Sequence, residues 1–69
     1  MNDVEYLQQS VTRGLEEILM TERGMSLVQA FELLRTSRVF ALLMDDETCL
    51  YRESPSYVYE LLKDENEWH

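Results

Sequence analysis

The first third of the chain has apolar residues at steps of three and four positions, which is the period of one face of an α-helix. Asn2 or Asp3 is placed to cap this segment, and Gly24 is placed to end it, because glycine readily takes the left-handed conformation that follows a helix. We therefore expect a long amphipathic helix over residues 1–22. Gly14 lies in its middle and favours close packing of another helix there. The apolar positions are Val4, Leu7, Val11, Leu15 and Ile18.

A helix pair is expected over residues 26–44. Ser26 and Gln29 have the spacing of a capping box, in which each side chain satisfies a free backbone N–H of the other residue. Ser37 is placed to stop this helix and to cap a third, shorter one. That third segment, residues 38–44, is apolar on most sides, which is typical of a buried helix.

Residues 45–54 read as an acidic turn followed by an extended connector. Asp45-Asp46-Glu47 has the consecutive charges of a solvated turn. We expect the connector to lay Leu50 and Tyr51 on the core, since two strands without further partners are only marginally stable. A small hairpin over residues 38–53 remains the alternative.

Ser54-Pro55 is the clearest local signal in the chain, because serine is a preferred N-cap and proline a preferred first helical residue. It predicts a last helix over residues 55–66. The fold expected from these elements is all-α, a small three-to-four-helix bundle in a single domain of residues 1–69. Its expected core consists of Leu7, Val11, Leu15, Ile18, Phe31, Leu34, Phe40, Leu43, Val58, Leu61 and Leu62.

Length and cysteine content limit how this fold is stabilised. A chain of 69 residues buries only about 60% of the surface that its unfolded form exposes. The single cysteine, Cys49, rules out a disulfide within the chain, and Cys49 with His69 supplies too few ligands for a structural zinc. The free cysteine and the lack of an apolar leader favour a reducing, cytoplasmic location. The longest apolar run, residues 39–44, is too short to cross a membrane.

The charge of the chain bears on its partners. Fourteen acidic and six basic residues give a net charge of −8, and the basic residues are scattered. Because nucleic-acid binding depends heavily on neutralised phosphates, direct binding to nucleic acid is disfavoured, as is binding to an anionic membrane. A basic protein would be attracted to this surface. Alternatively, the charge serves only to keep a small domain soluble.

No pattern in the chain indicates catalysis or a cofactor. An active site needs a nucleophile beside a base, paired carboxylates in a pocket or a metal, and the only histidine is His69. Asp45-Asp46-Glu47 lacks the alternating ligands and the glycine of a calcium-binding loop. Cys49 is expected to be a small buried apolar residue. We therefore expect no enzyme, no catalytic residue, no cofactor site and no metal site.

Aromatic residues supply the candidate binding site. Tyr51, Tyr57 and Tyr59 lie within nine positions, and Trp68 follows near the end of the sequence. Tyr57 and Tyr59 are two positions apart, so on one helix they point to different sides and at most one can be fully buried. Exposed tyrosine and tryptophan are enriched at protein interfaces. We take all four as candidate partner-binding residues. The alternative is that Tyr51 and Tyr57 lie at the edge of the core and that Tyr59 is incidental.

One further pattern consists of three segments: Ser26-Leu27-x-x-Ala30-Phe31-x-Leu33-Leu34, Ser37-x-x-Phe40-x-x-Leu43 and Leu50-Tyr51-x-x-Ser54-Pro55-x-Tyr57-Val58-Tyr59-x-Leu61-Leu62. Together they resemble short uncharacterised bacterial proteins, domains of unknown function encoded beside ADP-ribosyltransferase-like toxins. The resemblance covers about residues 26–65, and it departs where that family would have a glycine after the acidic turn and this chain has Cys49. It implies a small cytoplasmic accessory protein of an antitoxin-like kind, with no catalytic residue.

The function expected from these observations is that of a small acidic protein-interaction module that binds, and thereby neutralises or anchors, another protein. The partner is expected to be a basic protein that docks on an acidic rim around an aromatic and apolar patch. One alternative is a structural homodimer, in which a helix pairs with its twofold mate. Another is an accessory subunit of a DNA-binding or mobile-element complex that acts through a basic protein.

Overall fold

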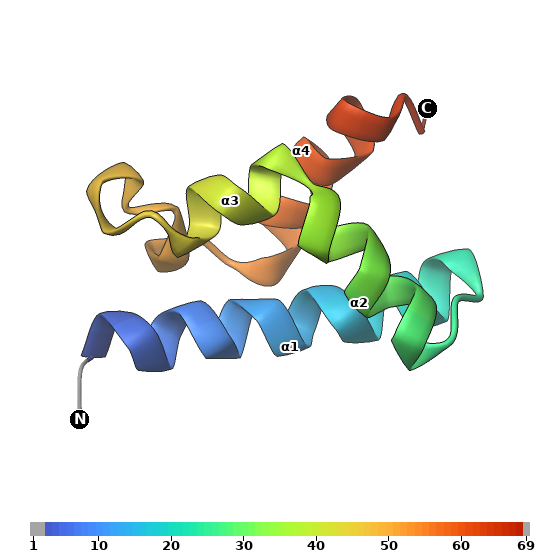
Figure 1. Ribbon diagram of the computed structural model, residues 1–69, viewed down its shortest axis with the longest axis horizontal. Helices are drawn as coiled ribbons and strands as arrows, with labels where there is room; N and C mark the ends of the chain where they lie inside the picture. Colours follow the sequence, from blue (N-terminus) through green and yellow to red (C-terminus); the bar gives the residue numbers. More distant parts are fainter. Residues whose placement is uncertain (1–2, 69) are drawn as a thin grey trace.

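The fold of this chain is built from helices (Figure 1). A computed structural model describes residues 3–68, so the expected cap Asn2 and the terminal His69 lie outside the described residues. In chain order the elements are α1 (Asp3–Arg23), α2 (Leu27–Thr36), α3 (Arg38–Met44), the 3-10 turns η1 (Asp46–Thr48) and η2 (Leu50–Arg52), and α4 (Pro55–Asn66). The prediction of an all-α fold is confirmed.

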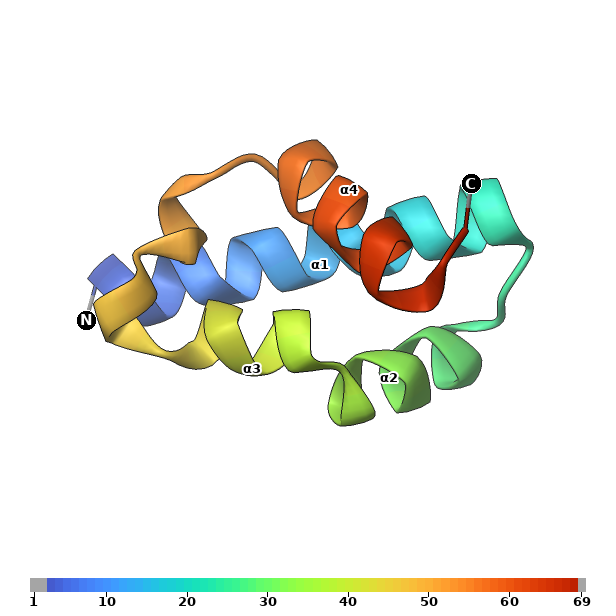
Figure 2. The same cartoon turned by 90° about the horizontal axis from the view of Figure 1, so that it is seen from above.

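The helices form three rows around one core. α1 is the first row, and α2 and α3 follow each other through a bend and run back antiparallel to it as the second row (Figure 1). α4 is the third row, and the view from above places α1 between the other two rows (Figure 2). α1 packs against both α2 and α4, while α3 packs against α4 and η2. The molecule measures 33 × 21 × 19 Å, with its long dimension along α1.

Local signals place most helix ends where the sequence predicted them. Ser26 accepts a hydrogen bond from the backbone N–H of Gln29 at 3.1 Å and returns one from its own N–H to Oε1 of Gln29 at 2.8 Å, so the capping box is complete. Ser54 caps α4 by accepting from the backbone N–H of residue 57 at 3.2 Å, with Pro55 in the first turn. Gly24 has a φ of 66° and follows the end of α1.

A polar contact fixes the bend between α2 and α3. Ser37 ends α2 and caps α3, where its hydroxyl accepts from the backbone N–H of Phe40 at 3.3 Å. The hydroxyl of Ser37 and the backbone N–H of Val39 both donate to one carboxylate oxygen of Glu65 on α4, at 3.0 and 2.8 Å. Because free N–H groups at a helix start favour negative charge, Glu65 both caps α3 and ties it to α4.

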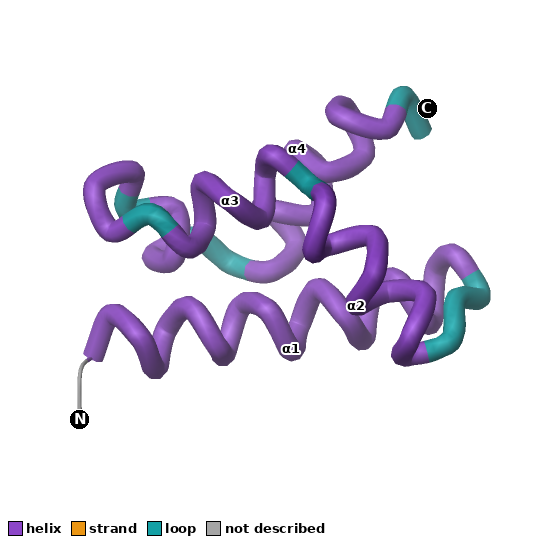
Figure 3. Tube along the Cα trace, viewed as in Figure 1, coloured by secondary structure: helices purple, strands orange, loops and turns teal. Residues whose placement is uncertain are grey.

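The segment after α3 is more tightly wound than the extended connector that the sequence predicted. No strand occurs within residues 3–68 (Figure 3), so the alternative of a hairpin was wrong as well. η1 and η2 meet at Cys49, whose φ of 57° lies in the left-handed region. The expectation that Cys49 is buried was also wrong, because this turn lies at the surface and leaves the thiol exposed.

The core lies where the three rows meet. The residues that confirm the predicted core are Val11, Leu15, Leu34, Leu43, Val58 and Leu62. It also contains Leu19, Ala30, Val39 and Tyr51, while Ile18, Phe40 and Leu61 are only partly buried. The prediction was wrong for Leu7 and Phe31, which are exposed.

The buried face of α1 is rotated relative to the predicted stripe. Gln8 rather than Leu7 faces inward. The side-chain amide of Gln8 donates to the backbone carbonyl of Leu43 at 3.2 Å and to Oδ1 of Asp46 at 3.0 Å. Burial of an amide is unfavourable unless it is hydrogen-bonded, so these two acceptors permit a polar residue at this position.

Gly14 allows α4 to begin in direct contact with α1. A Cβ atom at residue 14 would lie 2.6 Å from Cβ of Pro55 and closer still to Cγ, well inside van der Waals distance. The expectation that Gly14 permits close packing of another helix is therefore confirmed, and the contact is the proline that starts α4.

Candidate functional site

Tyr51, the first of the four aromatic residues predicted to bind a partner, is part of the core. Its side chain is only 7% exposed, because η2 packs against both α1 and α3. The expectation that Tyr51 lies on the core is confirmed, and little of its side chain is open to a partner.

Tyr57 and Tyr59 point to different sides of α4, as their spacing requires. Tyr57 is 49% exposed. Tyr59 is half-buried against the core, and the ammonium group of Lys63 lies 5.7 Å from the centre of its ring. Tyr57 is therefore open to a partner, whereas Tyr59 is partly covered by its own chain.

Trp68 packs against the core beside Arg23, the last residue of α1. Its ring is partly buried, and the guanidinium carbon of Arg23 lies 4.2 Å from the ring centre. Arg23, Trp68, Tyr59 and Lys63 line one shallow hollow, in which each aromatic ring has a cation of the same chain near its face. These cation–π contacts already satisfy the aromatic side chains at this end of the molecule.

Exposed apolar side chains gather instead at the start of α2. Leu27, Val28 and Phe31 are 55%, 69% and 57% exposed. Phe31 follows Leu27 by four residues and Val28 by three, so the three side chains are neighbours on one helix face. Met20 of α1 is 42% exposed and lines a hollow together with Leu27. We call Met20, Leu27, Val28 and Phe31 the α2 patch.

The composition of α2 explains why these residues are exposed. Ala30 and Leu34 are its buried residues, and α2 packs against α1 and α3. The larger apolar residues on either side of Ala30 and Leu34 then remain exposed to solvent. A signal for this was present in the sequence, because the apolar residues of α2 cover more than the single stripe that one packing contact requires. They are Leu27, Val28, Ala30, Phe31, Leu33 and Leu34.

Charged residues border the α2 patch on the side of α1. The hollow that contains Met20 and Leu27 is also lined by Arg13, Glu16 and Glu17. Within residues 3–68, neither glutamate takes part in an ion pair. Both carboxylates are therefore free to attract a positively charged group of a partner.

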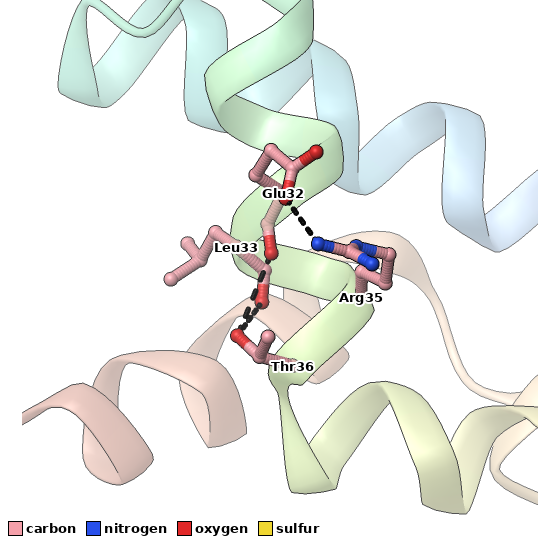
Figure 4. A network of polar contacts seen from close by, with 4 residues as sticks. All are labelled: Glu32, Leu33, Arg35 and Thr36. Atoms are coloured by element: carbon pink, nitrogen blue, oxygen red, sulfur yellow. Dashed lines mark hydrogen bonds and ion pairs between the residues drawn. The ribbon is translucent and has the colours of Figure 1, made fainter.

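The polar side chains in the second half of α2 are satisfied by groups of the same helix (Figure 4). Arg35 forms an ion pair with Glu32 at 2.7 Å, and the hydroxyl of Thr36 donates to the backbone carbonyls of Leu33 at 3.2 Å and Glu32 at 3.5 Å. An exposed pair of this kind contributes little to stability. Its two charges offset each other, so Glu32 adds less to the negative surface than the unpaired glutamates of α1.

Reactive and ligand-type side chains are dispersed over the described surface. No group of three or more His, Cys, Asp or Glu residues in that part of the chain could hold a metal ion. The thiol of Cys49 lies 3.9 Å from the backbone carbonyl of Asp46, which is its hydrogen-bond acceptor. No helix of residues 3–68 is long and apolar enough to span a membrane.

Comparisons with known proteins add no functional information. No protein-family model, no curated protein and no solved structure matches this chain. The resemblance to proteins encoded beside toxins therefore stays a prediction, and the candidate site is defined by geometry alone.

Proposed function

We propose that this chain works by binding another protein and not by catalysis. The observation that carries the proposal is the α2 patch, whose four large apolar side chains are each at least 42% exposed. An apolar cluster with a polar rim is typical of a protein-binding surface. A partner that covers it removes apolar area from water, which is favourable by about 25 cal/mol per Å².

The charge of the chain supports a basic partner. The net charge is −8, and the unpaired carboxylates of Glu16 and Glu17 border the patch. A basic protein would be attracted over a distance, and that attraction would weaken as salt rises. In line with the family resemblance, we propose a cytoplasmic accessory role of an antitoxin-like kind.

A structural homodimer is the second candidate function, and the same patch supports it. In a twofold dimer the exposed apolar stripe of α2 would meet its own copy. The two candidates differ in their response to salt. Two copies of net charge −8 repel each other, so salt would strengthen a dimer, whereas it would weaken the binding of a basic protein.

The test is affinity capture from an extract of the source organism at low and high salt, with the mass of the bait measured by light scattering. The baits are the wild type, Phe31→Glu in the α2 patch, and Tyr57→Glu as a matched control on α4. We expect a stoichiometric partner with the wild type and with Tyr57→Glu, and its loss with Phe31→Glu and at high salt.

Three outcomes would contradict this proposal. Retention of the same partner by Phe31→Glu would remove the α2 patch from the binding surface. Release of the partner by Tyr57→Glu alone would move the surface to α4. A wild-type dimer that Phe31→Glu splits into monomers, with no other protein captured, would favour the structural homodimer.

A further inference from the structure

Three shallow hollows follow one another along the side of α1 that faces α2 and α3. The first and second share Gln9 and Met44, and the second and third share Arg13 and Glu16. They therefore form one continuous trough, which begins beside Glu5 and ends at the α2 patch. We call it the α1 trough. Along α1 it runs over the sixteen residues from Glu5 to Met20, which corresponds to about 22 Å.

Exposed apolar side chains lie at two separate points of the α1 trough, and the partly buried Val4 lines its start. Met44 of α3 is 39% exposed and lies beside Gln9 and Thr12. Met20 lies two to three turns further along α1, about 12–16 Å away, and continues into Leu27 of the α2 patch. An amphipathic helix has its apolar residues at intervals of this size, at positions i, i+7 and i+11.

Negative charge dominates the α1 trough. Among the described residues that line it, Glu5, Asp46, Glu16 and Glu17 are acidic and Arg13 alone is basic. None of the four carboxylates takes part in an ion pair within residues 3–68, although Asp46 accepts a hydrogen bond from the amide of Gln8. An occupant that presents cations beside its apolar residues is therefore complementary to this surface.

We infer that the α1 trough binds one amphipathic helix of a basic protein. The helix would place one apolar residue against Met44 and others against Met20 and Leu27, with lysine or arginine residues beside Glu16 and Glu17. This inference rests on the proposed function and names the element that the partner supplies. The trough lies between helices, and the described chain has no strand whose edge could take an extended peptide, so helix-in-groove binding is the mode that fits.

A second copy of this chain is a poorer occupant. A stable dimer buries about 800 Å² on each copy, which is about one sixth of the 4862 Å² surface. A contact of that size on this side would bring the unpaired carboxylates of both copies into one interface. The net charge of each copy is −8, so the electrostatic contribution to self-association is repulsive.

The test uses three synthetic helical peptides of about 15 residues, the length that spans the trough. The first has leucine at positions that form one stripe and lysine elsewhere, the second has the same composition in scrambled order, and the third replaces each lysine with glutamate. Binding to the full chain is measured by fluorescence anisotropy at about 50 and 300 mM salt. We expect only the first peptide to bind, and to bind less tightly at the higher salt.

Charge-reversal variants locate the binding. Glu16→Lys changes the centre of the α1 trough, and Glu53→Lys is the matched control because it makes the same change of charge at an exposed residue outside the trough. We expect Glu16→Lys to weaken binding of the first peptide about tenfold and Glu53→Lys to change it less than twofold. We also expect Glu16→Lys to gain affinity for the glutamate peptide, a gain that an unfolded variant would not make.

The inference is overturned if the first peptide does not bind at millimolar concentration, if the scrambled peptide binds equally well, or if Glu53→Lys weakens binding as much as Glu16→Lys. The proposed function fails separately, when Phe31→Glu leaves capture of the natural partner unchanged. If Phe31→Glu releases the natural partner and Glu16→Lys does not, protein binding stands as the function. The α1 trough is then overturned as the site of a basic helix.

Discussion

The two long sides of α1 meet very different surroundings. Toward α4, Gly14 has no side chain and the ring of Pro55 fills the space, while Arg23 lies over Trp68 at the far end. Toward α2 and α3, the side chains leave a row of hollows, and apolar residues such as Met20 remain in contact with water. We call the α4 side, where these contacts within the chain lie, the closed side, although it holds the hollow beside Trp68. The side toward α2 and α3, with its exposed apolar residues, is the open side.

The type of a residue therefore does not by itself mark a binding site. Tyr51 and Trp68 are the kind of residue that interfaces favour, yet the chain covers Tyr51 fully and Trp68 in part. Phe31 has the pattern of a core residue, yet it is 57% exposed. Substitutions at covered and at open positions should therefore differ in their effect on stability.

The largest expected effect is at Tyr51. Replacement by alanine removes a buried aromatic ring of η2, the turn that packs against α1 and α3, so we expect Tyr51→Ala to lower the free energy of unfolding by about 3–5 kcal/mol. Tyr57→Ala, at an exposed position of α4, should change it by less than about 0.5 kcal/mol. Urea unfolding followed by circular dichroism measures both. Equal losses would refute the assignment of Tyr51 to the core and Tyr57 to the surface.

A smaller loss is expected at Gly14. Alanine is favoured over glycine inside a helix by about 1 kcal/mol, but its Cβ would meet the ring of Pro55. Overpacking of this kind costs about 1–3 kcal/mol, so we expect Gly14→Ala to be neutral to destabilising instead of stabilising. Glu17→Ala, on the open side of the same helix, is the control and should stabilise slightly. A clear gain of stability in Gly14→Ala would contradict the close contact between α1 and α4.

The smallest loss on the closed side is expected at Arg23. Its guanidinium group lies over the only tryptophan of the chain. Arg23→Ala should lower the free energy of unfolding by about 0.5–1 kcal/mol, the usual contribution of an exposed cation–π contact. Tryptophan fluorescence should shift to longer wavelength, because the ring becomes more hydrated. An unchanged emission spectrum would mean that Arg23 does not cover the ring in solution.

The parts of the fold that could be predicted from the sequence are those set by neighbouring residues. The capping box of Ser26 and Gln29, and the cap of Ser54 with Pro55, depend on residues three or fewer positions apart. Gly24 ends α1 for an equally local reason, its positive φ. Such signals are present in the sequence before any tertiary contact forms, so the helix ends follow from it.

The parts that could not be predicted depend on contacts between distant residues. Gln8 is buried because its amide reaches Leu43 and Asp46, which are 35 and 38 positions away. Phe31 was expected in the core because its spacing fits the buried stripe, and only the packing of α2 against α1 decides which side of that stripe faces water. The candidate site was consequently sought among the tyrosines, although the wide apolar surface of α2 was visible in its sequence.

The α2 patch is tested most directly by the free energy of unfolding of Phe31→Glu, measured by urea titration beside the wild type. Phe31 is proposed to serve a partner and not the core, so we predict a change of less than about 0.5 kcal/mol, as for other exposed positions. A loss of about 3–5 kcal/mol, the cost of removing a buried phenylalanine, would place Phe31 in the core and contradict the α2 patch.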